Sequence, residues 1–283
     1  MSAGKASVAV VTDSTADLPL DIKDRYGISA VPLNVMIDGR TWLDGQLSQQ
    51  EFFERMHSAA RLPTTSQPSV GAFVDEYAEA LERADHVASI HISNELSGTI
   101  DSARQAAERF AGSVTVFDSR NLSWGLGFQV IEAAKRALEG ETVESVIEAA
   151  AHARDRVQML VGLDSLDNLV KGGRVGRVAG FVGGMLNLKV TLTVEDGSFS
   201  PVSRVRGTKA ALAHTVDWVE DHLGDAKRAA FCVLHAMAPD RAARLEELVR
   251  ERFEVSELHV VETGAVIATH TGVGWAVAFL PEE

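Results

Sequence analysis

The stretch that decides the fold lies in the first half of the chain and reads Val87-Ala88-Ser89-Ile90-His91-Ile92-Ser93-Asn94-Glu95-Leu96-Ser97-Gly98-Thr99. Its first part is an apolar run typical of a buried strand, its middle is a hydroxyl-rich turn, and a helical pattern starts at Gly98. Strand, turn and helix in this order are typical of a parallel α/β sheet. Parallel sheets bind ligands at the carboxyl ends of their strands, so we expect this turn to belong to a binding site.

A second polar loop precedes a helix and reads Pro63-Thr64-Thr65-Ser66-Gln67-Pro68-Ser69-Val70-Gly71. The two prolines restrict their own backbone and that of the preceding residue, so the loop should be stiff. Ser69 is a good N-cap for the following helix. A rigid polar loop at a helix N-terminus suits an anionic head group, although a simple capped turn explains the same residues. Two such loops in one sheet could meet at one ligand.

The remaining pattern divides the chain near residue 157. Residues 7 to about 156 alternate strand and helix, with Ser29–Val35 as the second strand, which predicts a parallel sheet with helices on both faces. Beyond that point the pattern contains a hairpin with a turn at Asp196-Gly197, two helices, and further strands that include Ala265–Thr269. We therefore predict an α/β domain at residues 1–157 that carries the polar loops, and an α+β domain at residues 158–283.

Composition narrows the class of protein. The 283 residues carry a formal net charge of −13, which argues against non-specific binding to nucleic acid and against standing attachment to anionic lipid. No apolar run approaches the roughly 18–20 residues of a membrane span, so stable membrane insertion is not expected. The N-terminus has no signal-peptide pattern and the lone cysteine, Cys232, lies in an apolar run, so we expect a cytoplasmic protein without disulfides.

Motifs for catalysis, cofactors and metals are missing from the sequence. It contains no phosphate-binding G-x-x-x-x-G-K-[ST] loop, no H-E-x-x-H and no G-x-S-x-G, and its histidines lack metal-ligand spacing. We therefore expect no cofactor, no metal and no enzymatic activity. Three alternatives stay open: a hydrolase that uses His91 with Ser93 or Ser97, or His270; phosphotransfer by Asp13; and binding of a small phosphorylated ligand at Asp13–Ser14. The plainer role for Asp13 is to accept hydrogen bonds from backbone amides of its loop.

Six motifs, in this order and spread over nearly the whole chain, resemble the DegV family. They are Thr12-Asp13-Ser14-Thr15-Ala16-Asp17-Leu18-Pro19, Pro63-Thr64-Thr65-Ser66-Gln67-Pro68, Leu96-Ser97-Gly98-Thr99, Gly172-Gly173-Arg174-Val175, Val205-Arg206-Gly207-Thr208-Lys209-Ala210 and His270-Thr271-Gly272-Val273-Gly274. The resemblance implies a lipid-binding carrier of phospholipid metabolism. Such a carrier binds a long-chain fatty acid and presents its carboxylate to a separate ATP-dependent fatty acid kinase, which forms the acyl phosphate.

The resemblance also implies roles for particular residues. The head group is expected at Thr65 and Ser97, with Thr64, Ser66 and Ser93 as neighbours that could substitute. His270 matches a histidine near the head group, and Arg206 matches an arginine near the carboxylate or its phosphate, with Arg204 as the alternative. Arg174 matches an arginine that faces the kinase. The chain departs from the family at Gly172, where relatives often have serine.

The chemistry of the expected ligand agrees with these residue types. A partly buried carboxylate needs several hydrogen bonds, and neutral hydroxyl donors supply them without the desolvation cost of a buried lysine. A long acyl chain needs only a dry apolar tunnel, which we expect between or within the two domains. The tail would then provide the affinity and the polar loops the orientation.

Overall fold

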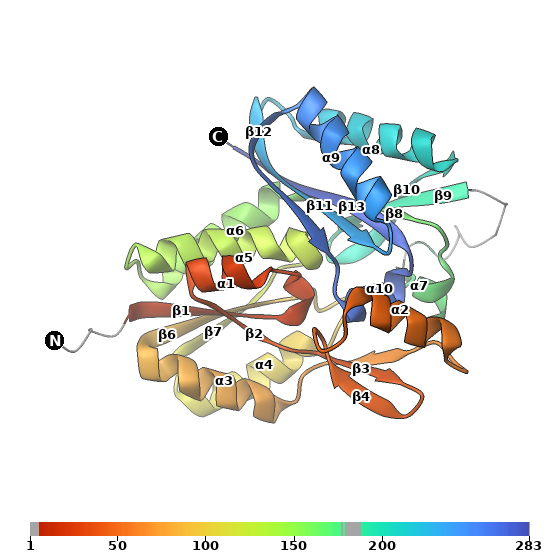
Figure 1. Cartoon of the computed structure of the whole chain (residues 1–283). Coiled ribbons are helices and arrows are strands. Elements are labelled where there is room, and N and C mark those ends of the chain that lie inside the picture. Colours follow the sequence, from red (N-terminus) through yellow and green to blue (C-terminus); the bar gives the residue numbers. More distant parts are fainter. Residues whose placement is uncertain (1–5, 177, 179–187, 283) are drawn as a thin grey trace. The chain divides into compact units, whose positions relative to one another are not determined.

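The computed structural model describes residues 6–176, 178 and 188–282 (Figure 1). The chain forms two compact units: unit 1 consists of Met1–Asn34 and Ser66–Asp155, and unit 2 of Val35–Thr65 and Arg156–Glu283. The chain therefore passes from one unit to the other three times. The apolar sequence at 181–187 lies outside the described residues. The division into domains at residues 1–157 and 158–283 stays a prediction, because compactness alone does not show that a segment folds by itself.

Unit 1 alternates strands and helices along the chain. Its elements are β1 (Ala6–Asp13), η1 (Ser14–Ala16), α1 (Leu20–Tyr26), β2 (Ile28–Val31), α3 (Val70–Arg83), β6 (Ala84–His91), α4 (Thr99–Ala107), η2 (Glu108–Phe110), β7 (Val114–Asp118), α5 (Ser123–Leu138) and α6 (Val143–Arg156). The strands form a parallel sheet in the order β2-β1-β6-β7. Helices α3 and α4 pack on one face, and α5 packs on the other (Figure 1). The predicted parallel α/β arrangement is confirmed.

The core of unit 1 lies between this sheet and helices α3 and α4. Phe73, Tyr77 and Ala80 recur at helical spacing on α3 and are fully buried against Val11 of β1 and Val87 of β6. This contact fixes α3, which follows one polar loop, against β6, which precedes the other.

Unit 2 combines a large mixed sheet with a small one. Its elements are β3 (Asn34–Ile37), β4 (Arg40–Leu43), α2 (Gln49–Ser58), β5 (Thr64–Ser66), β8 (Gln158–Leu163), α7 (Asp167–Lys171), β9 (Leu188–Glu195), β10 (Ser198–Arg206), α8 (Thr208–His222), β11 (Arg228–Ala236), α9 (Pro239–Arg252), β12 (Glu254–Glu262), α10 (Ala265–Thr271) and β13 (Gly274–Pro281). The large sheet has the order β10-β9-β8-β13-β11-β12 and the small one β4-β3-β5. Only the β11–β12 pair of the large sheet is parallel. The predicted α+β class and the β9–β10 hairpin are confirmed.

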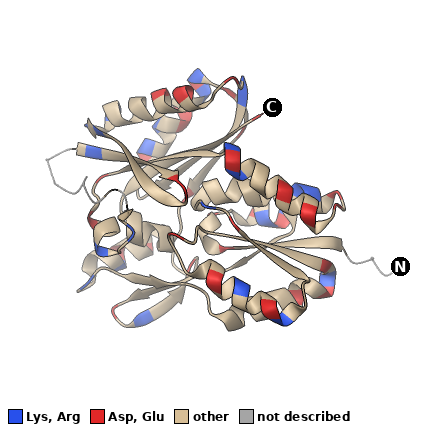
Figure 2. Cartoon of the chain, turned by 180° about the vertical axis from the view of Figure 1, so that it is seen from behind, with Lys and Arg blue, Asp and Glu red and all other residues tan. Residues whose placement is uncertain are grey.

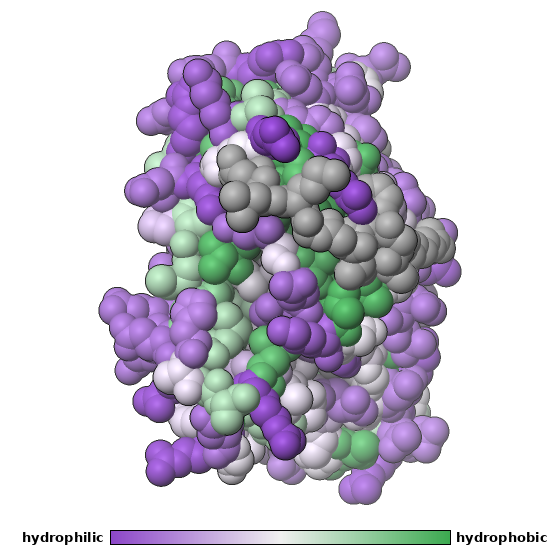
Figure 3. Space-filling view, turned by 90° about the vertical axis from the view of Figure 1, so that its right-hand side faces the viewer, coloured by the Kyte–Doolittle hydropathy of each residue, from purple (hydrophilic) through white to green (hydrophobic). Residues whose placement is uncertain are grey.

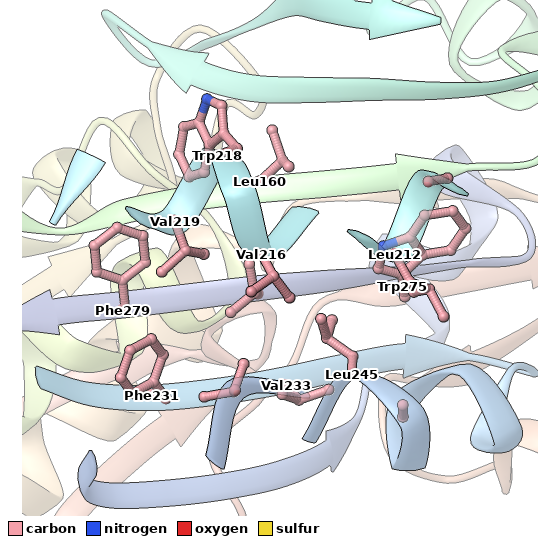
Figure 4. Close-up of a cluster of buried hydrophobic side chains, with 14 of the residues drawn as sticks. Leu160, Leu212, Val216, Trp218, Val219, Phe231, Val233, Leu245, Trp275 and Phe279 are labelled. Carbon is pink, nitrogen blue, oxygen red and sulfur yellow. The ribbon is translucent and has the colours of Figure 1, made fainter. Parts of the chain in front are cut away.

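The core of unit 2 lies between the large sheet and helices α8 and α9 (Figure 4). The ring of Phe279 on β13 stacks on Phe231 of β11 at 5.7 Å between centroids, and Trp218 of α8 meets it edge-on at 6.2 Å. Each buried aromatic side chain of this kind contributes roughly 2–3 kcal/mol.

Gln49 connects helix α2 to the large sheet of unit 2. Its side-chain Nε2 donates to the carbonyl oxygens of His235, at 3.0 Å, and Thr263, at 3.3 Å, and its Oε1 accepts from the backbone amide of Met237 at 2.7 Å. His235 lies near the end of β11, and Met237 and Thr263 follow β11 and β12, so the glutamine ties the inserted residues 35–65 to the large sheet of unit 2.

Two details of the predicted pattern are wrong. The segment Ala265–Thr269 was predicted as a strand but lies in helix α10. A short apolar run does not distinguish a strand from a buried helix, and in the helix the threonine hydroxyls donate to carbonyls four residues earlier. The sequence Ser29–Val35, predicted as one strand, forms β2 and β3, which are separated around Pro32.

Figure 2 shows acidic and basic residues along the outer helices. In the space-filling view of Figure 3, hydrophilic side chains surround smaller hydrophobic areas on the face that is drawn. Among the described residues, no helix combines the length and apolar character that crossing a bilayer requires.

Candidate functional site

The expected head-group residue Thr65 forms a hydrogen bond with His270. Its Oγ1 lies 2.8 Å from Nε2 of the imidazole, between β5 and the last turn of α10. Helix α10 is held there by Asn168 of α7, whose side-chain amide donates to the Thr269 carbonyl at 3.0 Å. A threonine and a histidine that are 205 residues apart in sequence therefore form one polar pair in unit 2.

His270 is a partly buried, neutral imidazole. Burial, and to a smaller extent the positive charge of Arg174, lower its pKa to about 4. Its second ring nitrogen, Nδ1, is buried and has no hydrogen-bond partner among the described residues. A neutral imidazole with a buried, unpaired nitrogen carries unused hydrogen-bonding capacity.

Gly172 leaves the space that the imidazole occupies. A Cβ at this position would lie 2.3 Å from Nδ1 of His270 and 2.9 Å from the carbonyl oxygen of Asn168. Arg174 folds back over the same turn and donates from Nη1 to the Gly172 carbonyl at 2.7 Å. Gly172 therefore lies against His270 with no room for a side chain in this arrangement. The turn also brings Arg174 into the neighbourhood of the Thr65–His270 pair.

The other expected head-group residues with hydroxyls lie in unit 1, apart from Thr64, which is exposed on β5. Ser97 is partly exposed at the start of α4, where its Oγ lies 2.8 Å from Thr99 Oγ1 and accepts from the Thr99 amide at 3.3 Å. Ser93 is fully buried, and its Oγ accepts from the Glu95 amide at 3.2 Å. Ser97 is therefore the more accessible donor of the two.

Gln67 is a candidate that the sequence reasoning did not name. Its exposed side-chain amide covers Gly98, where a Cβ would lie 2.5 Å from Oε1, and it donates to Ser102 Oγ at 3.3 Å. The amide thus lies beside Ser97 at the start of α4. Its neighbour Ser66 is exposed and accepts from the Asn34 side chain at 3.2 Å. An amide between two prolines in a polar loop was the available signal.

Arg204 and Arg206 lie together at the end of the edge strand β10 in unit 2. Two residues apart on a strand, they share one face of the sheet, and both are exposed. The fold therefore does not separate the two arginines as candidates for the head group, and both are carried forward.

The structure argues against phosphotransfer by Asp13 and against a hydrolase that uses His91 with Ser93 or Ser97. Asp13 is fully buried and accepts from the amides of Thr15 and Ile92, each at 3.0 Å, as the plainer interpretation expects. The ring of His91 contacts Asp13 and Ser89 rather than Ser93 or Ser97. Ser89 is itself fully buried, so this serine, histidine and aspartate do not meet a substrate. Among the described residues, no group of three His, Cys, Asp or Glu side chains is arranged to hold a metal ion.

Burial of His270 should make stability depend on pH. Its pKa is about 4 in the folded chain and near 6.5 in the unfolded chain, so the unfolded chain binds more protons between these values. The free energy of unfolding should therefore fall as the pH decreases from 6.5 to 4, by up to about 3 kcal/mol from this group. Urea unfolding at several pH values gives the free energy of unfolding as a function of pH. The slope of that dependence should be shallower for His270→Gln than for the wild type. The control His57→Gln, exposed on α2, should keep the wild-type slope, and equal slopes for wild type and His270→Gln would contradict the assignment.

Replacing Gly172 should disturb the same pair. In Gly172→Ala the new methyl group forces the imidazole away from Thr65, and we expect a loss of about 1–3 kcal/mol in unfolding free energy, together with changed His270 resonances in NMR spectra. Gly71→Ala is the control, because its methyl group meets only Ser69 Oγ at an ordinary 3.6 Å. Unchanged stability and His270 resonances in Gly172→Ala would show that the ring is not held in this position.

Comparisons with known proteins agree with this fold. The family model described as "Uncharacterised protein, DegV family" matches residues 7–282. A DegV domain-containing protein of Deinococcus radiodurans is 40% identical over 273 residues, which span 95% of this chain and 96% of that protein. The structure described as "Fatty Acid Binding of a DegV family Protein from Thermus thermophilus" matches with a TM-score of 0.92 and 38% identity, over 98% of this chain and 100% of that chain.

A more distant structure shows the same fold. The Streptococcus pneumoniae fatty acid kinase B3 protein, loaded with linoleic acid, matches with a TM-score of 0.84 at 22% identity, over 98% of this chain and 100% of that chain. From the family model, the 40% identical relative and the shared fold, we conclude that the chain belongs to the DegV family.

Proposed function

We propose that this chain binds a long-chain fatty acid and holds its carboxylate with the hydroxyl groups of Thr65 and Ser97. The carboxylate is then presented, in the cytoplasm, to a separate ATP-dependent kinase, and the chain itself performs no chemistry. The observation that carries the proposal is the hydrogen-bonded pair of Thr65 and His270.

The pair offers one unused hydrogen in either tautomer of the neutral imidazole. If Thr65 donates to Nε2, the proton of the ring lies on Nδ1, which has no partner among the described residues. If Nε2 donates to Thr65, the hydroxyl hydrogen of Thr65 is unused. An ionised carboxylate only accepts hydrogen bonds, so it fits a site that donates from neutral groups.

Ser97 adds a second donor of the same kind. When Thr99 donates to Ser97, the hydroxyl hydrogen of Ser97 is available to a ligand. Thr64, Ser66 and Ser93 remain proposed neighbours that could substitute for the two main donors. Arg206, or Arg204 beside it, would supply positive charge to the carboxylate or its phosphate.

The acyl tail would supply most of the binding energy. We propose that it occupies an apolar tunnel, where each buried CH₂ contributes about 0.8 kcal/mol, so a sixteen-carbon tail could contribute roughly 10 kcal/mol before the costs of association. The polar groups then need to orient the carboxylate rather than to provide affinity.

Relatives support both parts of the proposal to different degrees. The Thermus thermophilus protein, 38% identical, is described by its fatty acid binding. The kinase partner rests on the sequence resemblance around Arg174 and on the name of the Streptococcus pneumoniae protein, whose likeness extends to the fold. Arg174 contacts the turn beside His270, which suits a residue that reports the head group to a partner.

Fatty acid binding is tested first by mass spectrometry of the organic extract from protein purified without added lipid. We expect a stoichiometric fatty acid in the wild type, and affinity about 10- to 100-fold weaker in Thr65→Val or Ser97→Ala, because each loses a hydrogen bond to a charged group. Thr41→Val, exposed on β4, is the control for a removed hydroxyl. A double variant, Thr65→Val with Ser97→Ala, that binds as tightly as the wild type would disprove the head-group assignment.

The kinase partnership is tested with ATP, Mg²⁺, a purified bacterial fatty acid kinase and the loaded chain. Acyl phosphate should form only when both proteins are present. Arg174→Ala should retain fatty acid but support transfer at a rate about tenfold lower, because the partner loses a charged contact. Lys23→Ala, at a helix end in unit 1, serves as the control for a removed cation. Acyl phosphate formed by the chain alone would show that it is an enzyme.

A further inference from the structure

A continuous network of buried, hydrogen-bonded polar side chains lies in unit 1, and we call it the buried polar network. The Tyr77 hydroxyl lies 2.8 Å from Ser89 Oγ, which lies 2.6 Å from Nε2 of His91, and Nδ1 of that ring lies 3.0 Å from Asp13 Oδ2. All four residues are 0% exposed. The proposed function uses none of them, although a buried polar group is retained only where its hydrogen bonds are satisfied.

The hydrogen bonds of the buried polar network have one consistent direction. Asp13 accepts from the amides of Thr15 and Ile92 and from the Thr15 hydroxyl, so His91 Nδ1 must be a donor to it. In the neutral ring Nε2 then accepts from Ser89, and Ser89 accepts from Tyr77. Burial raises the pKa of Tyr77, which keeps the phenol a donor.

The buried polar network connects the elements of unit 1 that lie next to the proposed ligand loops. Tyr77 lies on α3, which follows the loop with Ser66 and Gln67, and Ser89 and His91 lie on β6, which precedes Ser93 and Ser97. Asp13 ends β1. Two backbone bonds extend the connection to the next strand end: Ser93 donates to the Asn121 carbonyl at 2.9 Å, and Ser119 donates to the His91 carbonyl at 3.1 Å.

The decisive contact is the one that Asp13 makes with both parts of the loop base. Its Oδ2 accepts from the His91 side chain and from the amide of the next residue, Ile92, each at 3.0 Å. These bonds fix the backbone at the point where β6 turns into the loop. The ring of Phe73 meets His91 edge-on at 5.0 Å and closes the remaining side.

We infer that Asp13 and His91 are positioning residues for the head-group serine Ser97. The inference rests on the proposed function: the serine can hold a carboxylate only if its loop keeps one conformation, because a displaced donor loses its hydrogen bond. Asp13 and His91 fix that conformation through hydrogen bonds at the buried base of the loop, and neither side chain contacts the ligand.

The test compares three variants in one fatty acid binding assay, with each variant's folding checked by urea unfolding. His91→Leu removes both ring hydrogen bonds and should bind about tenfold more weakly. His91→Asn can still donate to Asp13 and should recover most of the affinity. Tyr77→Phe removes the hydroxyl at the far end of the buried polar network but leaves His91 bonded to Asp13. This variant should therefore bind fatty acid within about twofold of the wild type even where its stability falls.

A readout in the wild-type protein does not depend on whether any variant folds. The imidazole nitrogens and the Nδ1 proton of His91 are followed by NMR while fatty acid is added. We expect their resonances to shift with occupancy, although His91 is buried below the loop. Unchanged His91 resonances on saturation, or a folded His91→Leu that binds as tightly as the wild type, would overturn the inference alone. A wild-type chain that binds no fatty acid would overturn the proposed function as well.

Discussion

A polar group that is taken out of water must find its hydrogen bonds inside the protein, and the strand-end loops of this chain are built around that constraint. Asp13 illustrates it best. Its carboxylate is fully buried with no cation against it among the described residues, and backbone amides, a hydroxyl and an imidazole provide its donors. Because these donors come from η1, directly after β1, and from the end of β6, satisfying one carboxylate fixes the geometry of two loops.

Unit 2 meets the same constraint only in part. Five buried side-chain atoms have no hydrogen-bond partner among the described residues: Ser200 Oγ, His235 Nδ1, Ser256 Oγ and His270 Nδ1 in unit 2, and Gln129 Oε1 in unit 1. Of these, only the His270 atom belongs to a residue that the sequence associates with a head group. The remaining geometry around it, from Gly172 to Thr65, keeps the ring in place without satisfying that nitrogen. An incomplete set of hydrogen bonds in otherwise rigid surroundings is typical of a site that a ligand completes.

The sequence predicts the fold class well because the prediction rests on a long alternating pattern of strands and helices. It fails where a pattern is short, as at Ala265–Thr269, whose apolar residues suit a strand or a buried helix equally. It also predicts the polar loops, since prolines and hydroxyls mark them. It does not predict the bond between Thr65 and His270 or the one between Ser89 and His91, because tertiary packing alone decides which side chains meet. The role of Gly172 was likewise invisible, since a glycine reveals its reason only when its neighbours are placed.

The inserted residues 35–65 have a consequence for the order in which the protein can be completed. They leave the ribosome before most of unit 1, yet they belong to unit 2, which cannot form until residues 156–282 have followed. His270, the hydrogen-bond partner of Thr65, is therefore synthesised 205 residues after it. During that interval the nascent chain carries the hydroxyl of the pair without its imidazole. The Thr65–His270 pair can therefore form only after residue 270 has been synthesised, and a shorter nascent chain lacks the polar pair with which we propose the protein holds a fatty acid.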